Sequence, residues 1–590
     1  MTDTSIHYRI HPANPAAHRF EVSCTVMAPD PAGQRLALPA WIPGSYLIRE
    51  FARNVLSIRA ESGGKTVRLE KIDKHTWQAP ALKAGQPITV TCEIYAWDLS
   101  VRGAHLDPTH AFFNGTSVFL RAIGQESSPC LVDIQPPDGK TFKNWRVATA
   151  LEPASGEKGS AKRHGFGLYR AESYDALIDH PVEMGTFSLA TFEACGVPHD
   201  VAITGRHDCD MKRLTADLKR VCEWQIRFFG EPAPMRRYVF LVTAVGDGYG
   251  GLEHRASTAL LCSRNDLPYP GMKGLPESYR SFLGLCSHEY FHTWNVKRIK
   301  PAAFVPYDLD RENYTTQLWA FEGITSYYDD LALLRSGVIE LKDWLELTAK
   351  TITNVHRSPG RLRQSLAESS FDAWSKFYRP DENTPNAVVS YYAKGALAAL
   401  ALDLTLRKES RNKISLDDVM RVLWTRFGQT GNGVGDDDIR LIAEELSGLN
   451  LGRFFADTLH GTRDLPLKRL LSPFGVRLEW ERAKTASLGI KTGTEGNELK
   501  LATVYDDGPA QQAGLAAGDV LVALNGLRVT PAAFDKHLAR LNPDDTVELH
   551  AFRRDELMQF SVRLAPPPAD TARLLADTAS SILRKGWLGH

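Results

Sequence analysis

The chain of 590 residues is too long for a single hydrophobic core, and its length predicts roughly three or four domains. Its 70 basic and 70 acidic residues give a formal net charge of zero, which argues against nucleic acid or an anionic membrane as a partner. Eight cysteines occur without a C-x-x-C pair, a pattern typical of reduced thiols rather than of a disulfide framework or a cysteine zinc site.

The start of the chain carries no sign of a signal peptide. Residues 1–8 lack both the positively charged start and the apolar core of such a leader. The sequence also contains no run of about 20 apolar residues that could span a bilayer. We therefore expect a cytoplasmic protein, unless a leader has been trimmed from the sequence.

Residues 1–170 predict an N-terminal β-sandwich-like domain. Polar and apolar residues alternate over 19–26, 88–97 and 117–120, which is the period of a half-buried strand. Glycine and proline separate these segments. Two prolines within residues 39–46 indicate an irregular loop.

Residues 171–404 mix helical and strand patterns and predict a catalytic domain. Residues 211–229 have helical spacing, and short apolar runs at 201–204, 237–243 and 257–262 predict strands. A glycine-rich segment precedes the last of these strands. Its glycines, Gly250 and Gly251 among them, allow the backbone to approach a ligand closely, so we expect them to bind substrate.

The pattern H-E-x-x-H, formed by His288, Glu289 and His292, carries the clearest chemistry in the chain. Positions four apart lie on one face of a helix, so the two imidazoles can bind one metal ion, with Glu289 placed to act on water. The flanking residues are apolar and predict a buried helix, where unpaired polar groups cost several kcal/mol. The alternative is a helix with two ordinary histidines.

A catalytic zinc needs three protein ligands and an open position, so a third ligand must come from elsewhere. Glu322 stands alone in an aromatic and aliphatic run, and we favour it over Glu312, whose neighbours are polar. The alternative reading of Glu322 is a solvated glutamate at a helix edge. Asp329, two helical turns later, could hydrogen-bond a ligand histidine or could be a plain surface residue.

The last third of the chain predicts three more segments. Residues 405–474 have helical spacing and predict a helical extension of the catalytic domain. Residues 475–565 resemble a bacterial-type PDZ domain, in which residues 487–490 match the loop that binds a peptide carboxylate. Residues 566–590 predict a short C-terminal amphipathic helix, which either docks on the protein or forms a dimer contact.

Together these motifs resemble the gluzincin metallopeptidases, the group that includes aminopeptidase N. The H-E-x-x-H pattern is followed by Trp319-x-x-Glu322-Gly, as in that group, although the segment between His292 and Glu322 is longer here. The longer segment and the PDZ-like region make the chain most similar to the glycyl aminopeptidase family. This resemblance implies a thermolysin-like or aminopeptidase N-like catalytic domain that holds one Zn²⁺ per chain.

The resemblance also implies roles for two further residues. Gly250-Gly-Leu-Glu253-His254 is similar to a Gly-x-Met-Glu-Asn motif whose glutamate binds the free α-amine of the substrate. Glu253 would have that role, unless it caps a loop or pairs with Arg255. Tyr392 matches the tyrosine of a Tyr-x-Lys-Gly motif that stabilises the tetrahedral intermediate, and Tyr391 is the alternative donor.

The sequence thus predicts a multidomain α+β zinc aminopeptidase that removes N-terminal Gly or Ala from peptides, with Glu289 as the general base. Its expected partners are peptides with a free N-terminus, and a peptide C-terminus in the PDZ groove is a further possibility. Two alternatives stay open. One is a zinc endopeptidase whose PDZ domain selects substrates, and the other is a non-enzymatic PDZ binding protein.

Overall fold

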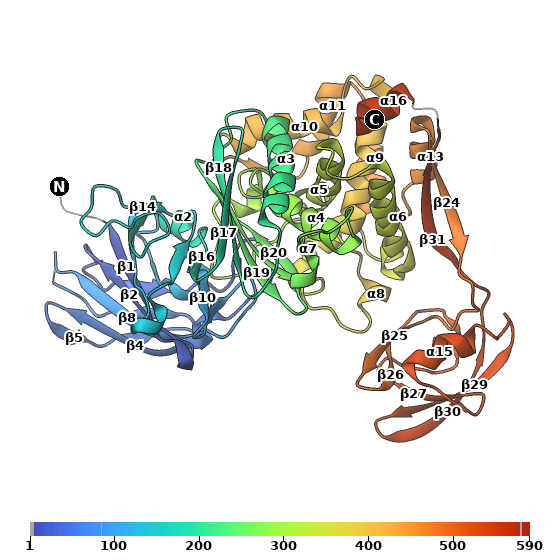
Figure 1. The fold of residues 1–590 in the computed structure, drawn as a ribbon, viewed down its shortest axis with the longest axis horizontal. Helices are drawn as coiled ribbons and strands as arrows, with labels where there is room; N and C mark the ends of the chain where they lie inside the picture. Colours follow the sequence, from blue (N-terminus) through green and yellow to red (C-terminus); the bar gives the residue numbers. More distant parts are fainter. Residues whose placement is uncertain (1–4, 84, 579–580, 590) are drawn as a thin grey trace. The chain divides into compact units, whose positions relative to one another are not determined.

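The computed structural model describes residues 5–83, 85–578 and 581–589 (Figure 1). The chain divides into two compact units, and each is described by itself. Unit 1 consists of Met1–Asn313, Ser336–Val338 and Trp424–Gly433. Unit 2 consists of Tyr314–Arg335, Ile339–Leu423 and Val434–His590.

The N-terminal part of unit 1 is built on a large sheet with the strand order β14-β15-β12-β1-β2-β8-β4-β5. Alternate residues of β1, β2 and β8 are buried, as the alternating sequence predicts. The strands of this sheet are β1 (Ile6–Asn14), β2 (Arg19–Val26), β4 (Val55–Ser62), β5 (Lys65–Val67), β8 (Ile88–Tyr95), β12 (Cys130–Ile134), β14 (Glu152–Pro153) and β15 (Gly167–Ala171).

Two smaller sheets complete this part, with the orders β11-β3-β7-β6 and β13-β16-β10-β9. Because β16 pairs with β10 and β13, the N-terminal sheets extend past residue 170, where we placed the domain boundary. The elements are β3 (Arg35–Ala37), β6 (Glu70–Lys71), β7 (Thr76–Gln78), β9 (Ala104–Leu106), β10 (His110–Phe113), β11 (Arg121–Ala122), β13 (Arg146–Ala148), β16 (Val182–Gly185) and the helix α2 (Tyr174–Ile178).

The strand predicted at residues 117–120 is wrong. Helix α1 (Gly115–Val118) occupies this position, and all of its residues are buried. The hydroxyl of Ser117 donates to the carbonyl of Asn114 over 2.8 Å, which helps to close the turn. Serine often makes such local bonds, and they compete with strand pairing.

The remainder of unit 1 holds a mixed sheet with the order β17-β18-β19-β21-β20. Strands β18, β19 and β21 run parallel, and the edge strand β20 runs antiparallel to β21. Helix α3 (Met211–Phe229) has the predicted bounds, and its Gln225 amide donates to both the carbonyl and the hydroxyl of Ser287 in α4 (Glu277–Phe291). The strands are β17 (Ser188–Ala194), β18 (Val197–Thr204), β19 (Tyr238–Val245), β20 (Tyr249–Glu253) and β21 (Ser257–Ser263).

Unit 2 begins with helices packed around α9, which is buried along most of its length. A helix that is apolar on all sides belongs at the centre of such a bundle. The helices are α5 (Ile324–Arg335), α6 (Leu341–Arg357), α7 (Leu366–Phe371), α8 (Thr384–Ala387), α9 (Ala393–Ser410), α10 (Leu416–Leu423), α11 (Asp438–Ser447), α12 (Gly452–Phe455) and α13 (Leu467–Leu471).

A PDZ-like sheet with the order β25-β26-β27-β29-β30 follows, and β28 pairs with β27. Its apolar core includes Leu501, Leu549 and Val562, all nearly inaccessible to solvent. The elements are β25 (Ile490–Glu495), β26 (Glu498–Val504), α14 (Pro509–Gln512), β27 (Val520–Leu524), β28 (Leu527–Arg528), α15 (Pro531–Leu538), β29 (Thr546–Arg553) and β30 (Glu556–Arg563).

The C-terminal segment is only partly helical, so the prediction of one helix over 566–590 is wrong. Strand β31 (Ala569–Ala576) pairs antiparallel with β24 (Val476–Arg482), outside the PDZ-like sheet. Helix α16 (Ile582–Leu588) follows and docks on unit 2, as one of the two readings expected. Its Trp587 is fully buried, and the indole N–H donates to the hydroxyl of Tyr327 over 2.8 Å.

Within the described parts of the chain, every helix is too short or too polar to cross a bilayer.

Candidate metal centre

Helix α4 brings the two histidines of the H-E-x-x-H pattern together in unit 1. The Nε2 atoms of His288 and His292 lie 3.0 Å apart. The Nδ1 atom of His292 donates to the carbonyl of Asn295 over 2.8 Å, which leaves the lone pair on Nε2. Two ring nitrogens this close fit adjacent ligands of one zinc ion, whose bonds to histidine measure about 2.0–2.1 Å.

The turn after His292 is held in a strained shape by buried charges. Val296 has a φ of 93°, which a β-branched residue rarely adopts. Beside it, the ammonium of Lys297 lies 2.6 Å from the carboxylate of Asp179, and Arg298 donates to the carbonyls of Thr293 and Arg255. These contacts fix the backbone that orients the His292 ring.

Glu289 lies against the backbone of the edge strand β20. A Cβ atom at Gly251 would stand 2.1 Å from Oε1 of Glu289, so only glycine fits while the carboxylate keeps this position. Arg102 donates to the carbonyl of Gly251 over 3.2 Å and so also holds this strand. The neighbouring Gly250 is less crowded, since its nearest atom, in Arg102, is 3.8 Å away.

Glu253 ends the same strand and is 4 % exposed. Its carboxylate packs on Gly44, where a Cβ atom would stand 2.5 Å from Oε1 and 2.6 Å from Oε2. Arg255 forms ion pairs with Asp175 and Asp179. Sequence reasoning missed Gly44, although the Pro-Gly step in residues 39–46 signals an unusual backbone.

His254, the residue after Glu253, forms a buried polar pair with Asp179. The Nδ1 atom of His254 lies 3.4 Å from Oδ1 of Asp179. Burial lowers the pKa of His254 to about 4, so the ring is neutral near pH 7. Although burial opposes ionisation of Asp179, the charges of Lys297 and Arg255 hold the pKa of that carboxyl well below its usual range.

Glu322 belongs to unit 2, where it sits in a π-helical turn, η6 (Trp319–Gly323), just before α5. The residue is 2 % exposed, so the reading of a solvated glutamate is wrong. π-Helical turns inside helices occur frequently at functional sites. The rival Glu312 is half-buried, lies outside any helix or strand and belongs to unit 1.

A pair of glycines packs the turn of Glu322 against the start of α9. A Cβ atom at Gly323 would stand 2.5 Å from the Cα of Gly395, and a Cβ atom at Gly395 would stand 2.9 Å from the Cα of Gly323. Gly323 follows Glu322, and Gly395 follows Lys394, in the two motifs identified from the sequence. The sequence did not indicate that the two glycines are in contact. Their contact brings Tyr391 and Tyr392 to the same region of unit 2 as Glu322.

The two tyrosines differ in accessibility. Tyr391 is 0 % exposed, and burial raises its pKa well above the usual value, with Tyr378 and Glu322 adding to the effect. Tyr392 is half-buried, and its hydroxyl lies 3.4 Å from that of Tyr378. The more accessible phenol is therefore that of Tyr392.

Asp329 is half-buried in α5. For His292, the hydrogen-bond acceptor of Nδ1 is the carbonyl of Asn295 and not this carboxylate. Backbone carbonyls serve as well as carboxylates in orienting ligand histidines.

Three segments of the chain match known families. Residues 7–186 match the Peptidase M61 N-terminal domain, residues 281–398 match M61 glycyl aminopeptidase, and residues 486–564 match a PDZ domain. The first match ends at residue 186, just after β16.

Among solved structures, an aminopeptidase N family protein from Idiomarina loihiensis is 42 % identical, with a TM-score of 0.94 over 99 % of this chain and 100 % of that chain. A mutant of the M1 zinc metallopeptidase from Deinococcus radiodurans shares the fold at 14 % identity, with a TM-score of 0.50 over 78 % of this chain and 95 % of that chain.

Curated relatives cover a much smaller part. A probable periplasmic serine endoprotease DegP-like protein from Brucella suis is 34 % identical over 89 residues, which is 15 % of this chain. The chain spans only 17 % of the length of that relative.

The buried His254 predicts a pH dependence of stability. Its ordinary pKa of 6.5 applies to the unfolded chain, and the folded pKa is about 4. As the pH falls between these values the unfolded state binds more protons, so the free energy of unfolding falls, by about 2 kcal/mol between about pH 7 and pH 5. Urea unfolding of the wild type and of His254→Asn at both pH values measures this loss of unfolding free energy. The loss should be smaller in His254→Asn by about 2 kcal/mol. An equal loss in both proteins would contradict the neutral buried ring.

Proposed function

The chain belongs to the glycyl aminopeptidase family of zinc metallopeptidases, and we propose that it removes glycine or alanine from the N-termini of peptides. The zinc aminopeptidase class follows from the family. The preference for small residues is supported by the family description and by the close approach of Gly44 to Glu253, which narrows the space beside that carboxylate.

The distance between Gly251 and Glu253 along β20 supports removal of a single residue from the substrate N-terminus. Gly251 contacts Glu289, and Glu253 lies two positions further on the same face of the strand. Residues two apart on a strand are separated by about 6.6 Å. An ammonium held by Glu253 would therefore leave room for about one amino acid before the group on which Glu289 acts.

We infer that His288, His292 and Glu322 hold the zinc ion. Two imidazoles and a carboxylate form the donor set of catalytic zinc sites with an open position. The 3.0 Å spacing of the histidine nitrogens and the burial of Glu322 fit this role. When bound, zinc supplies Lewis acidity that acidifies water and polarises the substrate carbonyl.

Different residues would carry out proton transfer, stabilise the oxyanion and bind the substrate. Glu289 accepts the proton of the attacking water and passes it to the leaving amine. Tyr392 donates a hydrogen bond to the oxyanion without adding charge, as its accessible phenol allows. Glu253 binds the substrate ammonium, and Gly250 and Gly251 let the peptide backbone approach.

The PDZ-like domain offers a second peptide site. In the described residues β25 is the end strand of its sheet, next to the loop at 487–490. An extended peptide C-terminus could add to this edge through main-chain hydrogen bonds. Peptide binding at this edge would not involve the residues of the zinc centre.

A panel of aminoacyl chromogenic amides, free and N-acetylated, tests the aminopeptidase proposal. We expect cleavage of free Gly and Ala amides that a zinc chelator abolishes, and no cleavage of acetylated ones. Glu253→Gln should raise KM for free amides, because the buried carboxylate that pairs with the ammonium is lost. Cleavage of acetylated substrates by the wild type would favour an endopeptidase instead.

Gly251→Ala tests the position of Glu289. The added Cβ must displace the carboxylate, so kcat should fall about 100-fold while zinc stays bound. Gly246→Ala is the matched control, because its Cβ would have only Arg264 nearby, at 3.7 Å. Equal activity in both variants, measured on glycyl amide, would show that Glu289 does not act from this position.

Paired tyrosine variants identify the oxyanion donor. Tyr392→Phe should lower kcat by about 10²–10³-fold with little change in KM, as expected for a group that binds only the transition state. Tyr391→Phe should keep most of the activity. The reverse result in steady-state assays would assign the role to Tyr391.

A further inference from the structure

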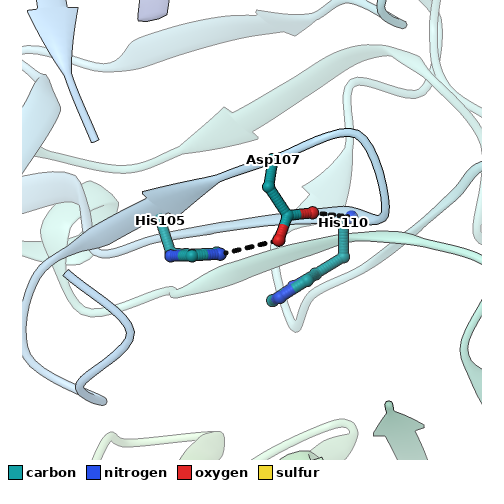
Figure 2. A group of neighbouring side chains, drawn as sticks. All are labelled: His105, Asp107 and His110. Carbon is teal, nitrogen blue, oxygen red and sulfur yellow. Dashed lines mark hydrogen bonds and ion pairs between the residues drawn. The ribbon is translucent and has the colours of Figure 1, made fainter. Parts of the chain in front are cut away.

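A second group of metal-ligand residues lies in unit 1, on the hairpin of β9 and β10. The sequence His105-Leu-Asp107-Pro-Thr-His110 forms its turn, and Figure 2 shows the three side chains gathered together. His105 pairs with Phe112 across the hairpin, so His105 and His110 are diagonal neighbours on one face. Each residue offers one ligand atom, and these atoms lie within 4.8 Å of one another.

The turn holds the carboxylate of Asp107 in place. One oxygen, Oδ1, accepts hydrogen bonds from the backbone N–H groups of Thr109 and His110 and from the Thr109 hydroxyl. The other oxygen, Oδ2, lies 3.3 Å from Nε2 of His105. Asp107 is thus fixed through one oxygen and presents the second to the histidine.

A buried carboxylate orients His110. Its Nδ1 donates to Oε1 of Glu183 over 3.0 Å, and the hydroxyl of Thr204 donates to the same oxygen over 2.8 Å. In the neutral ring this tautomer has its lone pair on Nε2, the nitrogen available to a metal ion. A carboxylate behind the ring is the usual support of a metal-binding histidine.

Two carboxylates and two histidines make up the charged and titratable groups of this cluster. Among the described residues, the ion pairs of Asp107 and Glu183 are with His105 and His110 only. His105 is 4 % exposed, His110 7 % and Glu183 2 %. A divalent ion held by the three residues would place positive charge beside both carboxylates.

We propose that His105, Asp107 and His110 bind a divalent transition metal ion of the Zn²⁺ type, at a site separate from the H-E-x-x-H helix. Two imidazoles and a carboxylate favour zinc over calcium or magnesium, which prefer oxygen ligands. Water can complete the coordination, since Asp107 is partly accessible.

Such an ion would stabilise the hairpin of β9 and β10, which Arg102 links to β20. Arg102, just before β9, donates to the carbonyl of Gly251, the residue that contacts Glu289. The metal would cross-link β9 to β10 and so limit the movement of the segment that carries Arg102. We expect a structural role, because the buried histidines leave little room for a substrate.

Zinc content measured in full-length protein tests the site. The double variant His288→Ala/His292→Ala, stripped with a chelator, exposed to Zn²⁺ and desalted, should retain about one zinc per chain by mass spectrometry. Adding His105→Gln and His110→Gln should lower this to near zero. His18→Gln is the matched control. Its ring contacts Trp97, which also contacts His105, but its Nδ1 bonds the Leu106 carbonyl.

Asp107→Asn tests the site with a variant that should still fold. The amide oxygen can still accept the bonds of the turn, so the melting temperature without metal should change little while zinc affinity falls at least about tenfold. No zinc in the double variant, or the same zinc content after His105→Gln and His110→Gln, would overturn the proposal. Since the H-E-x-x-H ligands are absent throughout, failure of the proposed peptidase function would not affect this result.

Discussion

The centre of unit 1 depends on two imidazole nitrogens that lie 3.0 Å apart on consecutive turns of α4. At this distance the two nitrogens can bind one metal ion as adjacent ligands. Neighbouring groups hold the helix and the His292 ring in place. The carbonyl of Asn295 fixes the protonated nitrogen of His292, and Gln225 ties α4 to α3.

Glycine determines how closely the neighbouring carboxylates can lie to the backbone. Gly251 makes room for Glu289, and Gly44 makes room for Glu253. In both cases a Cβ atom would occupy the space of a carboxylate oxygen. Glu289 and Glu253 are thus positioned by the absence of a side chain at Gly251 and at Gly44, as well as by contacts.

Buried ion pairs connect the N-terminal domain to the catalytic helix. Asp179, at the end of α2, pairs with Lys297 in the turn that follows His292. Breaking such a pair leaves an uncompensated buried charge and costs several kcal/mol. The N-terminal domain therefore contributes to the geometry of the metal centre, although its own sheets carry none of the H-E-x-x-H residues.

The sequence by itself determined the features that depend on neighbours along the chain. The spacing of His288 and His292, the bounds of α3 and the PDZ-like pattern follow from helix and strand periods, which are local. The isolated carboxylate in an apolar run also identified Glu322 as buried. Only the tertiary structure decided which distant groups meet, such as Gly251 with Glu289 and Lys297 with Asp179. It also made residues 569–576 a strand, because the hydrogen-bond partner β24 lies far away in sequence and periodicity within the segment cannot reveal it.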